Sequence, residues 1–409
     1  MSDSGLPVRC VIVPPSPAPY REPLFRALHE RRDLDVCVIY QSAEQPSWDV
    51  AAEWFAAEHP YPARHLRSWQ RSRPGRTPMV WPRRLEGALR AADPDCVVAS
   101  EYGPASLRAL AWCRRHRRAY VVFTECTPMI DAMLARSQLQ LHRSVARHAD
   151  GVIAVSSAAR ARLLSFDVPA ERIAVALQSA DLEPVRAAAA DRRPNGEPES
   201  AGHRERNGHR PLTVISVGRL VPDKNFASLI TGFARSGLDP QQARLEIVGT
   251  GFLEPALRRL ADTLDVPVRF HGHVPPRDLA KVFAEADIYA LASTYEPFGV
   301  SVREAAAAGL PLICSSAAGA AGDVAIDGRN AILIDPDRIE EISAALARLA
   351  SDDGLRRRMS AESRAIDAAT DGRDVDAFAS AVLAAARGRG AGADADAGAG
   401  VGGGRLGRG

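Results

Sequence analysis

Short runs of β-branched and apolar residues alternate with helix-forming segments along this chain, and the whole pattern occurs twice. In the first half the expected strands lie at 8–13, 34–40, 95–99, 119–124, 151–155 and 172–176. In the second half they lie at 212–217, 243–248, 268–271, 287–291, 311–314 and 331–334. Strands that are continuously apolar are buried on both faces, which is typical of parallel sheets covered by helices. The sequence therefore predicts an α/β protein with two Rossmann-like domains facing a central cleft, since such sheets bind ligands beyond the carboxyl ends of their strands.

Segments with helical periodicity lie between these strands. In the first half helices are expected at 21–31, 78–91, 104–117, 128–149 and 157–165. In the second half they are expected at 224–235, 253–264, 276–285, 300–308 and 338–350. This alternation indicates βαβ units, in which each helix connects one parallel strand to the next.

Composition places the domain boundaries. The stretch 187–210 is rich in Gly, Pro and Arg and has almost no large apolar residue, so it cannot support a core and indicates a linker or insertion. We therefore expect one domain at 1–186 and a second at 211–352. Helices at 353–386 would follow, with a return to the first domain left open, and the Gly/Ala-rich segment 387–409 predicts a disordered tail.

Several classes of protein are disfavoured by composition. The six cysteines show no CxxC spacing, which favours a reducing compartment and argues against a structural zinc site. The first residues lack a basic stretch that leads into an apolar core, and no run reaches the roughly 18 apolar residues of a membrane span. We therefore expect a cytoplasmic protein, with contact to a membrane surface left open.

Two loops of the second half carry features of phosphate-binding loops. After one strand, Gly218 permits a tight turn, and Arg219 and Lys224 place two cations near a helix start. A lysine is unfavourable at the positive end of a helix dipole unless an anion binds there. A solvated surface loop is the alternative. After the next strand, Gly249 and Gly251 would let backbone approach a ligand closely, although a plain tight turn explains them equally well.

The segment 292–304 carries the strongest signal. A strand ends, Glu296 lies in the following loop, and a short helix that contains Glu304 runs to a Gly–Pro stop. The first amides of a helix have no partner within it and can hold a phosphate. Carboxylates beside them suit the hydroxyl groups of a sugar, although each glutamate alone could simply lie on a solvated face. The amides in question belong to Phe298, Gly299 and Val300.

The second half contains four motifs in a fixed order: Gly-Arg…Lys, Gly-x-Gly, FHGHVP and EPFGVSVRE. This series resembles the donor half of the retaining family 4 glycosyltransferases of the GT-B fold. The resemblance is close over about 211–350 and looser in the first half. It implies that Arg219 and Lys224 bind the donor diphosphate and stabilise the leaving group, and that Glu296 contacts hydroxyls of the donor sugar. Fixed cations and a helix start can stabilise a leaving diphosphate without a metal, and no Asp-x-Asp motif is present.

The same resemblance assigns the remaining donor contacts. Glu304 would bind the ribose, and the amides of the short helix would support the diphosphate. The stretch that would line the base comprises His271, Gly272, His273 and Val274. The chain departs from the family pattern at Arg303, Ala320 and Ala331. No cofactor is implied, because the UDP- or GDP-sugar is itself a substrate.

The first half is less informative about its ligand. Its first loop is similar to relatives with a P-Y-R-x-P-L-F pattern, so Tyr20 and Arg21 would face the cleft and touch the acceptor; a helix cap with a solvated arginine is the alternative. Glu125 follows another strand and is a candidate catalytic group. Between 64 and 90 there are eight arginines and one acidic residue, a composition found in proteins that bind anionic lipid or nucleic acid, and also on ordinary solvated surfaces.

Together with the resemblance, these observations predict a metal-independent glycosyltransferase, and the resemblance implies that it retains the anomeric configuration. It would use a nucleotide-sugar donor and a glycan or polyprenyl-diphosphate-linked acceptor, in bacterial surface polysaccharide synthesis, with contact to an anionic membrane and none to nucleic acid. The alternatives are another GT-B enzyme, such as a nucleotide-sugar epimerase or a phosphorylase, and a non-catalytic protein that binds sugar nucleotides. A phosphorylase needs a cofactor lysine, and Lys281 is expected on a helix away from the loops.

Overall fold

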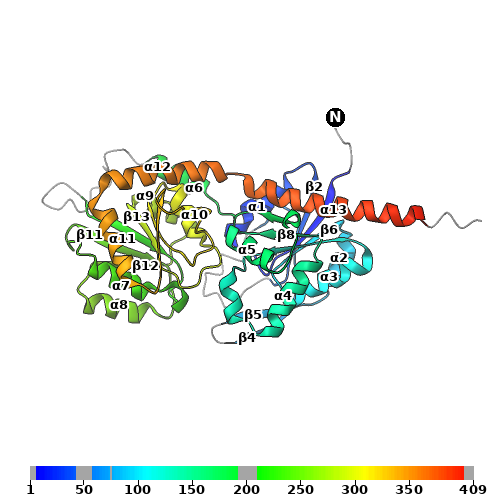
Figure 1. The fold of residues 1–409 in the computed structure, drawn as a ribbon, viewed down its shortest axis with the longest axis horizontal. Coiled ribbons are helices and arrows are strands. Elements are labelled where there is room, and N and C mark those ends of the chain that lie inside the picture. The colour runs from blue at the N-terminus through cyan, green and yellow to red at the C-terminus, as the bar shows by residue number, and fades with distance from the viewer. Residues whose placement is uncertain (1–5, 43–57, 74–75, 192–209, 400–409) are drawn as a thin grey trace, which may run out of the picture. The chain divides into compact units, whose positions relative to one another are not determined.

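The structure is a computed structural model that describes residues 6–42, 58–73, 76–191 and 210–399. The chain forms two compact units (Figure 1). The first comprises residues 1–177 and 372–409, and the second comprises 178–371. The boundary lies before the expected residue 186, because α6 (Glu183–Ala190) packs against α9 and α10 of the second unit. Most of the expected linker, at 192–209, lies outside the described residues.

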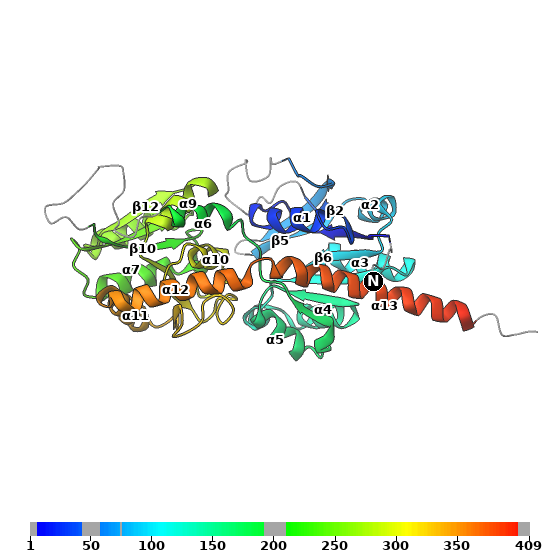
Figure 2. The same ribbon diagram turned by 90° about the horizontal axis from the view of Figure 1, so that it is seen from above.

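The first unit contains a seven-stranded sheet in the order β3-β2-β1-β6-β7-β8-β9, with every pair of neighbours parallel. The strands are β1 (Val8–Val13), β2 (Leu34–Tyr40), β3 (Ala63–His65), β6 (Cys96–Ser100), β7 (Ala119–Thr124), β8 (Gly151–Ala154) and β9 (Ile173–Val175). The helices are α1 (Glu22–His29), α2 (Leu85–Ala92), α3 (Pro104–His116), α4 (Arg136–His148), α5 (Ser157–Ser165) and α13 (Arg373–Ala399). The sheet is buried because α2 and α3 pack on one face and α1 and α13 on the other (Figure 2).

Two of the expected helices differ in the structure. The first half of the helix expected at 78–91 is not helical, since β5 (Arg76–Pro82) pairs antiparallel with β4 (Ser68–Arg73) and α2 begins only at Leu85. Prolines and the β-branched and aromatic residues between them favour a hairpin edge over a helix. Likewise, the helix expected at 128–149 is split, because a 3₁₀ turn at Pro128–Met133 precedes α4.

The second unit contains a six-stranded parallel sheet in the order β12-β11-β10-β13-β14-β15, which is the strand order of a Rossmann fold. The strands are β10 (Leu212–Val217), β11 (Ala243–Val248), β12 (Val268–Gly272), β13 (Ile288–Leu291), β14 (Leu312–Ser315) and β15 (Ala331–Ile334). The remaining helices are α7 (Phe226–Arg235), α8 (Glu254–Thr263), α9 (Pro276–Glu285), α10 (Val300–Ala307), α11 (Ile339–Ser351) and α12 (Asp353–Thr370). The apolar runs expected as strands form the core of this sheet.

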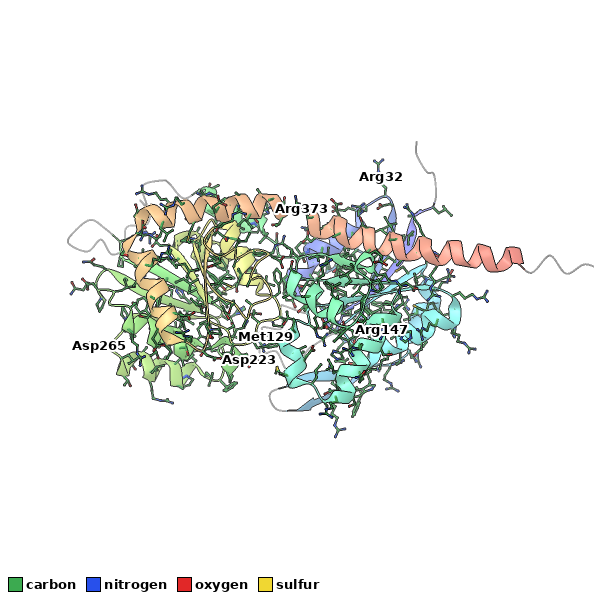
Figure 3. All side chains as sticks on the ribbon, viewed as in Figure 1. Arg32, Met129, Arg147, Asp223, Asp265 and Arg373 are labelled. Atoms are coloured by element: carbon green, nitrogen blue, oxygen red, sulfur yellow. The ribbon has the colours of Figure 1, made fainter. Side chains whose placement is uncertain are left out.

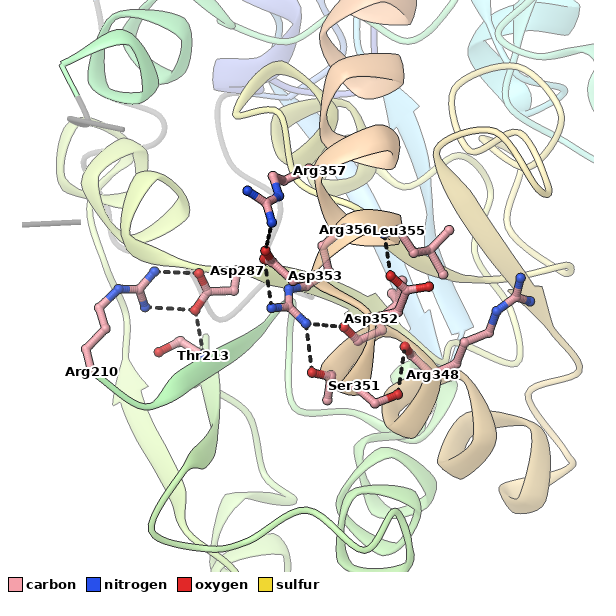
Figure 4. A network of polar contacts seen from close by, with 12 residues as sticks. Arg210, Thr213, Asp287, Arg348, Ser351, Asp352, Asp353, Leu355, Arg356 and Arg357 are labelled. Atoms are coloured by element: carbon pink, nitrogen blue, oxygen red, sulfur yellow. Dashed lines mark hydrogen bonds and ion pairs between the residues drawn. The ribbon is translucent and has the colours of Figure 1, made fainter. Parts of the chain in front are cut away.

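Polar side chains stabilise the amino ends of elements in this unit (Figure 4). Asp287, at the start of β13, accepts hydrogen bonds from Arg210 at 2.8 Å and from the backbone N–H of Thr213 at 2.9 Å. Asp352 caps α12, because its carboxylate accepts the amide of Leu355 at 2.8 Å. These contacts are structural and lie at the opposite end of the sheet from the carboxyl edge that was expected to bind ligand.

The C-terminal segment also differs from expectation. We expected disorder from Arg387, but α13 continues to Ala399 in the described chain. Alanine has the highest helix propensity, and the Arg389 guanidinium anchors this helix through a 2.8 Å hydrogen bond to Asp150. Across the described residues, no helix is both long and apolar enough to cross a membrane.

Candidate functional site

The loops expected to bind ligand meet at the carboxyl edge of the second unit's sheet. The loop after β10 ends in a 3₁₀ turn at Pro222–Lys224, and the loop after β13 leads into α10. The two loops are joined because the amide of Thr294 donates to the carbonyl of Asp223 at 2.9 Å. Asp223, labelled in Figure 3, therefore fixes the position of the lysine that follows it.

Lys224 and Glu296 form an ion pair at this junction. The lysine Nζ donates a hydrogen bond to Glu296 Oε2, and only 18% and 9% of the two side chains are exposed. The lysine stem lies over Gly218, where an added Cβ would come within 3.5 Å of the lysine Cδ and Cε. The structure thus brings Glu296 to Lys224, from which it is 72 positions away in the sequence. Arg219, on the same loop, has an exposed side chain.

Gly249 and Gly251 have a packing role that the sequence did not reveal. Gly249 has a φ of +134°, and a Cβ there would lie 2.0 Å from the carbonyl oxygen of Gly218. A Cβ on Gly251 would lie 2.4 Å from the carbonyl oxygen of Leu220. The loops after β10 and β11 therefore pack backbone against backbone, and the amide of Leu220 donates to the carbonyl of Thr250 at 2.8 Å. The glycines are needed for this approach whether or not they touch a ligand.

The start of α10 is held by a second glycine-rich segment. Gly299 caps the helix with a φ of +99°, and Phe298 before it is buried. The amide of Gly319 donates to the carbonyl of Glu296 at 3.0 Å, and the amide of Ala320 donates to that of Phe298 at 2.8 Å. A Cβ on Gly319 would lie 2.0 Å from the carbonyl oxygen of Pro297, so only glycine fits. The first amides of α10, including that of Val300, have no partner within the helix.

Two residues of α10 have surroundings that the sequence did not indicate. Burial raises the pKa of the Glu304 carboxyl to about 7, and the charge of Asp181 adds to this effect. Arg303, which departs from the family pattern, is 4% exposed and donates to the backbone carbonyl of Gln178 at 2.7 Å. The arginine at this position therefore connects α10 to the segment where the second unit begins.

The stretch expected to line a base lies at the end of β12. His271 Nε2 is 2.8 Å from Glu246 Oε2 on β11, so the histidine ring is held by a buried carboxylate. Arg244 Nε lies 2.8 Å from the other oxygen of Glu246. Gly272 has a φ of +69°, His273 is exposed, and Val274 is partly exposed. Glu246 was missed because it reads as one polar residue inside an apolar strand.

In the first unit, the structure contradicts the alternative of a solvated Arg21. Its side chain is 8% exposed, forms an ion pair with Glu125, and lies 5.7 Å from the centre of the Phe123 ring. The ring of Tyr20 lies 5.6 Å from the same guanidinium. Arg21 and Glu125 were expected to act separately, on the acceptor and in catalysis, but they neutralise each other.

Glu101 joins this pair and was not assigned a role from the sequence. Its carboxylate accepts the backbone amide of Glu125 at 2.7 Å and the hydroxyl of Thr124 at 2.9 Å. Burial raises the pKa of Glu101, and the charge of Glu125 raises it further. The backbone at Glu101 is left-handed, with a φ of +61°, and a sequence gives little sign of such a conformation. Three charged groups thus share the carboxyl edges of β1, β6 and β7.

A second polar cluster lies at the start of α1 and was also missed. The two carboxylate oxygens of Glu22 accept hydrogen bonds from Tyr40 at 3.0 Å and from Tyr61 at 2.5 Å. His59 Nδ1 lies 3.2 Å from the same carboxylate, and its Nε2 lies 3.3 Å from Nε2 of His65. These residues come from three separate segments, which is why no motif identifies them. Among the residues that the structure describes, no three His, Cys, Asp or Glu side chains are grouped to hold a metal ion.

Family models match both units of the chain. The model described as Glycosyl transferase 4-like domain matches residues 4–177, and the model described as Glycosyl transferases group 1 matches residues 201–366. The chain is a member of glycosyltransferase family 4. The resemblance seen in the sequence is therefore confirmed, as is the predicted α/β fold with two Rossmann-like domains.

Curated relatives match only part of this family 4 glycosyltransferase. Mannosylfructose-phosphate synthase of Agrobacterium fabrum is 31% identical over 153 residues, which make up 35% of this chain and 34% of the relative. A GDP-mannose-dependent α-(1-6)-phosphatidylinositol monomannoside mannosyltransferase of Mycobacterium tuberculosis is 31% identical over 229 residues, 53% of this chain and 57% of the relative. The match thus spans about a third of the first relative and little more than half of the second.

Solved structures resemble the family 4 glycosyltransferase over almost its whole length. HepE of Anabaena, solved in complex with UDP, superposes with a TM-score of 0.69 at 19% identity, and the match covers 95% of this chain and all of HepE. WaaG, a glycosyltransferase involved in lipopolysaccharide biosynthesis, superposes with a TM-score of 0.64 at 15% identity, covering 91% and 99% of the two chains. At these identities the likeness establishes the GT-B fold.

Proposed function

We propose that this protein is a retaining glycosyltransferase that moves a sugar from a UDP- or GDP-sugar to a glycan or polyprenyl-diphosphate-linked acceptor. The observation that carries the proposal is the buried Lys224–Glu296 pair beside the start of α10. A lysine, a carboxylate and free helix amides at one point provide contacts for a diphosphate and for the sugar attached to it.

The leaving group explains why cations belong here. When the bond between the sugar and the diphosphate breaks, the electron pair stays on the phosphate oxygen and negative charge develops there. Lys224, the exposed Arg219 and the first amides of α10 would stabilise that charge, and groups fixed before the reaction do so most effectively. Glu296 would then exchange its contact with Lys224 for hydroxyls of the donor sugar.

Two further groups would bind the nucleoside. The raised pKa of Glu304, about 7, keeps a fraction of this carboxyl protonated near neutrality, so it can both donate to and accept from ribose hydroxyls. The contact with Glu246 fixes the orientation of the His271 ring, and the opposite edge of the ring would face the nucleoside. Gly272, His273 and Val274 would complete the surface against the base. HepE was solved with UDP, and the mycobacterial relative uses GDP-mannose, so both bases are candidates.

The first unit would bind the acceptor. Tyr20 lies against Arg21, whose ion pair with Glu125 would shape the surface that receives the acceptor hydroxyl. We propose that Glu125 acts there on the acceptor and that the reaction takes place at the cytoplasmic face of a membrane, in surface polysaccharide or lipid-linked glycan synthesis. WaaG, which is involved in lipopolysaccharide biosynthesis, has the same fold.

The first experiment is a thermal-shift screen of the full chain against UDP, GDP, ADP and their sugars. A nucleotide that binds the native state raises its midpoint, and Lys224→Ala should weaken that rise for every nucleoside diphosphate. Donor turnover is then followed with the nucleotide that binds, with and without EDTA; unchanged turnover in EDTA is expected for metal-independent transfer. Binding without any turnover on any acceptor would favour the non-catalytic alternative, and interconversion of free nucleotide-sugars would favour an epimerase.

A further inference from the structure

The hairpin formed by β4 and β5 in the first unit has two different faces. It lies below the sheet of this unit in the view of Figure 1. Trp69 pairs with Trp81 and Arg71 pairs with Met79, so these four side chains share one face of the ribbon. On that face Trp69 is 58% exposed, Met79 is 49% exposed, and Arg71 is exposed as well.

The other face of the hairpin is turned toward the protein. Gln70 donates a hydrogen bond to the hydroxyl of Ser42 at 2.9 Å. Pro82 is buried, and its carbonyl accepts a hydrogen bond from Arg108 on α3 at 2.5 Å. A surface ribbon normally turns its apolar face inward, so this hairpin is inverted, with aromatic and methionine side chains pointing away from the unit.

The segment that forms this outward face carries charge of one sign in its sequence. Residues 63–85 include seven arginines and no aspartate or glutamate. Arg67, Arg71 and Arg83 are exposed on or beside the two strands. Glu86, the first acidic residue after the hairpin, is already bonded to Arg108 on α3. The exposed apolar side chains of Trp69 and Met79 are therefore accompanied by exposed arginines on the same two strands and their flanks.

We propose that the β4–β5 hairpin docks this protein on an anionic lipid bilayer. Trp69 and Met79 would enter the boundary between headgroups and acyl chains, while the arginines contact lipid phosphates. The pairing of the tryptophans favours lipid over nucleic acid. Their ring centroids are 4.8 Å apart and the ring planes are tilted by 44°, so Trp81 lies beside Trp69 and narrows the space for a base, which stacks on an open aromatic face. Met79 adds an apolar group that inserts into lipid without stacking.

The experiment measures co-sedimentation of the full chain with two kinds of vesicle, phosphatidylcholine alone and phosphatidylcholine mixed with phosphatidylglycerol. Binding is expected only to the mixed vesicles, and it should weaken as salt is raised. Arg67→Gln with Arg71→Gln should lower the partition coefficient by roughly 30-fold at low salt, from about five-fold for each arginine. Trp69→Ser with Met79→Ser should lower it by about ten-fold or more, and this loss should persist at high salt.

Matched controls separate docking from general charge and from misfolding. Arg114→Gln with Arg115→Gln removes the same charge from exposed positions on α3, and Phe252→Ser removes an aromatic that is 72% exposed in the second unit. Both should bind vesicles like the wild type, and all variants should keep the wild-type thermal midpoint. Equal losses in hairpin and control variants would overturn the proposal. The proposal would also be overturned if the wild-type protein did not bind the mixed vesicles, or if it bound single-stranded RNA through Trp69 and not the vesicles.

Discussion

The carboxyl edges of the two sheets are built in different ways. In the second unit, backbone contacts fix the loops, since Gly249, Gly251 and Gly319 each approach a carbonyl too closely for any side chain. In the first unit, side chains fix the corresponding loops through Arg21, Glu125 and Glu101. Backbone packing demands particular residues at fixed spacing, whereas an ion-pair network can be assembled from many positions. The unit proposed to bind the donor therefore carries a readable motif, and the unit proposed to bind the acceptor does not.

This contrast also suggests a division of labour. If the second unit binds the donor as proposed, its ligand carries a nucleoside diphosphate, which a rigid backbone-built site can hold. Acceptors differ, and a site built from side chains can change without rebuilding the fold. The comparison can be tested by breaking each edge separately and measuring donor turnover, nucleotide binding and stability in turn.

The largest expected effect is on turnover at the donor edge. Lys224→Ala should lower kcat/KM for the donor by about 10²- to 10³-fold, because one preorganised charge that stabilises the leaving group is lost. Glu296→Gln is the companion variant, which keeps the shape of the glutamate and should also lower turnover. Initial rates of nucleoside diphosphate release measure both.

A loss of folding must be separated from this loss of chemistry. Removing the lysine leaves Glu296 buried without its partner, so Lys224→Ala should also lose some stability. Lys224→Arg keeps the cation and should retain stability while turnover remains reduced. If Lys224→Ala turns over donor at the wild-type rate, the site is misassigned.

The second prediction concerns the backbone of the donor edge. Gly249→Ala should lower the free energy of unfolding by roughly 2 to 4 kcal/mol, because the new Cβ meets the Gly218 carbonyl in a strained backbone conformation. Gly87→Ala on α2 is the control, since a Cβ there meets nothing within 4 Å, and it should stabilise the protein by about 0.5–1 kcal/mol. Urea unfolding monitored by circular dichroism measures both. Equal, small effects would mean that the two loops do not pack as described.

The contrast between local backbone signals and long-range side-chain contacts also explains which parts of the structure can be predicted from the sequence. Both sheets, the loops around Lys224 and Glu296, and every strand of these two sheets except the short, exposed β3 (Ala63–His65) were predictable, because apolar runs and glycine spacing are local signals. Residues 78–82 of β5 were expected to begin a helix, because Met79 and Val80 also fit a helical pattern when the prolines are given too little weight. The partnership of Arg21 with Glu125 joins residues 104 positions apart, and no periodicity records such a contact.

The third prediction breaks the acceptor edge. Arg21→Met leaves Glu125 and Glu101 as neighbouring carboxylates without a cation, and it should cost about 3–5 kcal/mol of stability, the usual effect of removing one partner of a buried pair. Arg147→Met is the control, because its pair with Asp167 is exposed and should contribute at most about 1 kcal/mol. Thermal shift by UDP or GDP should be unchanged, relative to each variant's own baseline, in both. A specific loss of nucleotide binding in Arg21→Met would remove the division between the two edges.

The smallest expected effect is a pH dependence at the donor edge. Burial raises the pKa of Glu304 from an ordinary 4.5 to about 7. Because the folded pKa lies above the unfolded one, the folded state binds more protons between these values, and stability falls as pH rises from about 4.5 to about 7. Glu304→Gln removes this titration, so its urea midpoint relative to the wild type should be lowest near pH 4.5 and should rise toward pH 7.

Glu340→Gln on α11 supplies the comparison, because that side chain is 74% exposed and its removal should not change the slope with pH. Subtracting the two profiles isolates the buried carboxyl from the titration of every other group. If Glu304→Gln and Glu340→Gln give parallel profiles, Glu304 is an ordinary solvated acid. It would then be fully ionised near neutrality and could accept hydrogen bonds from ribose hydroxyls but not donate them.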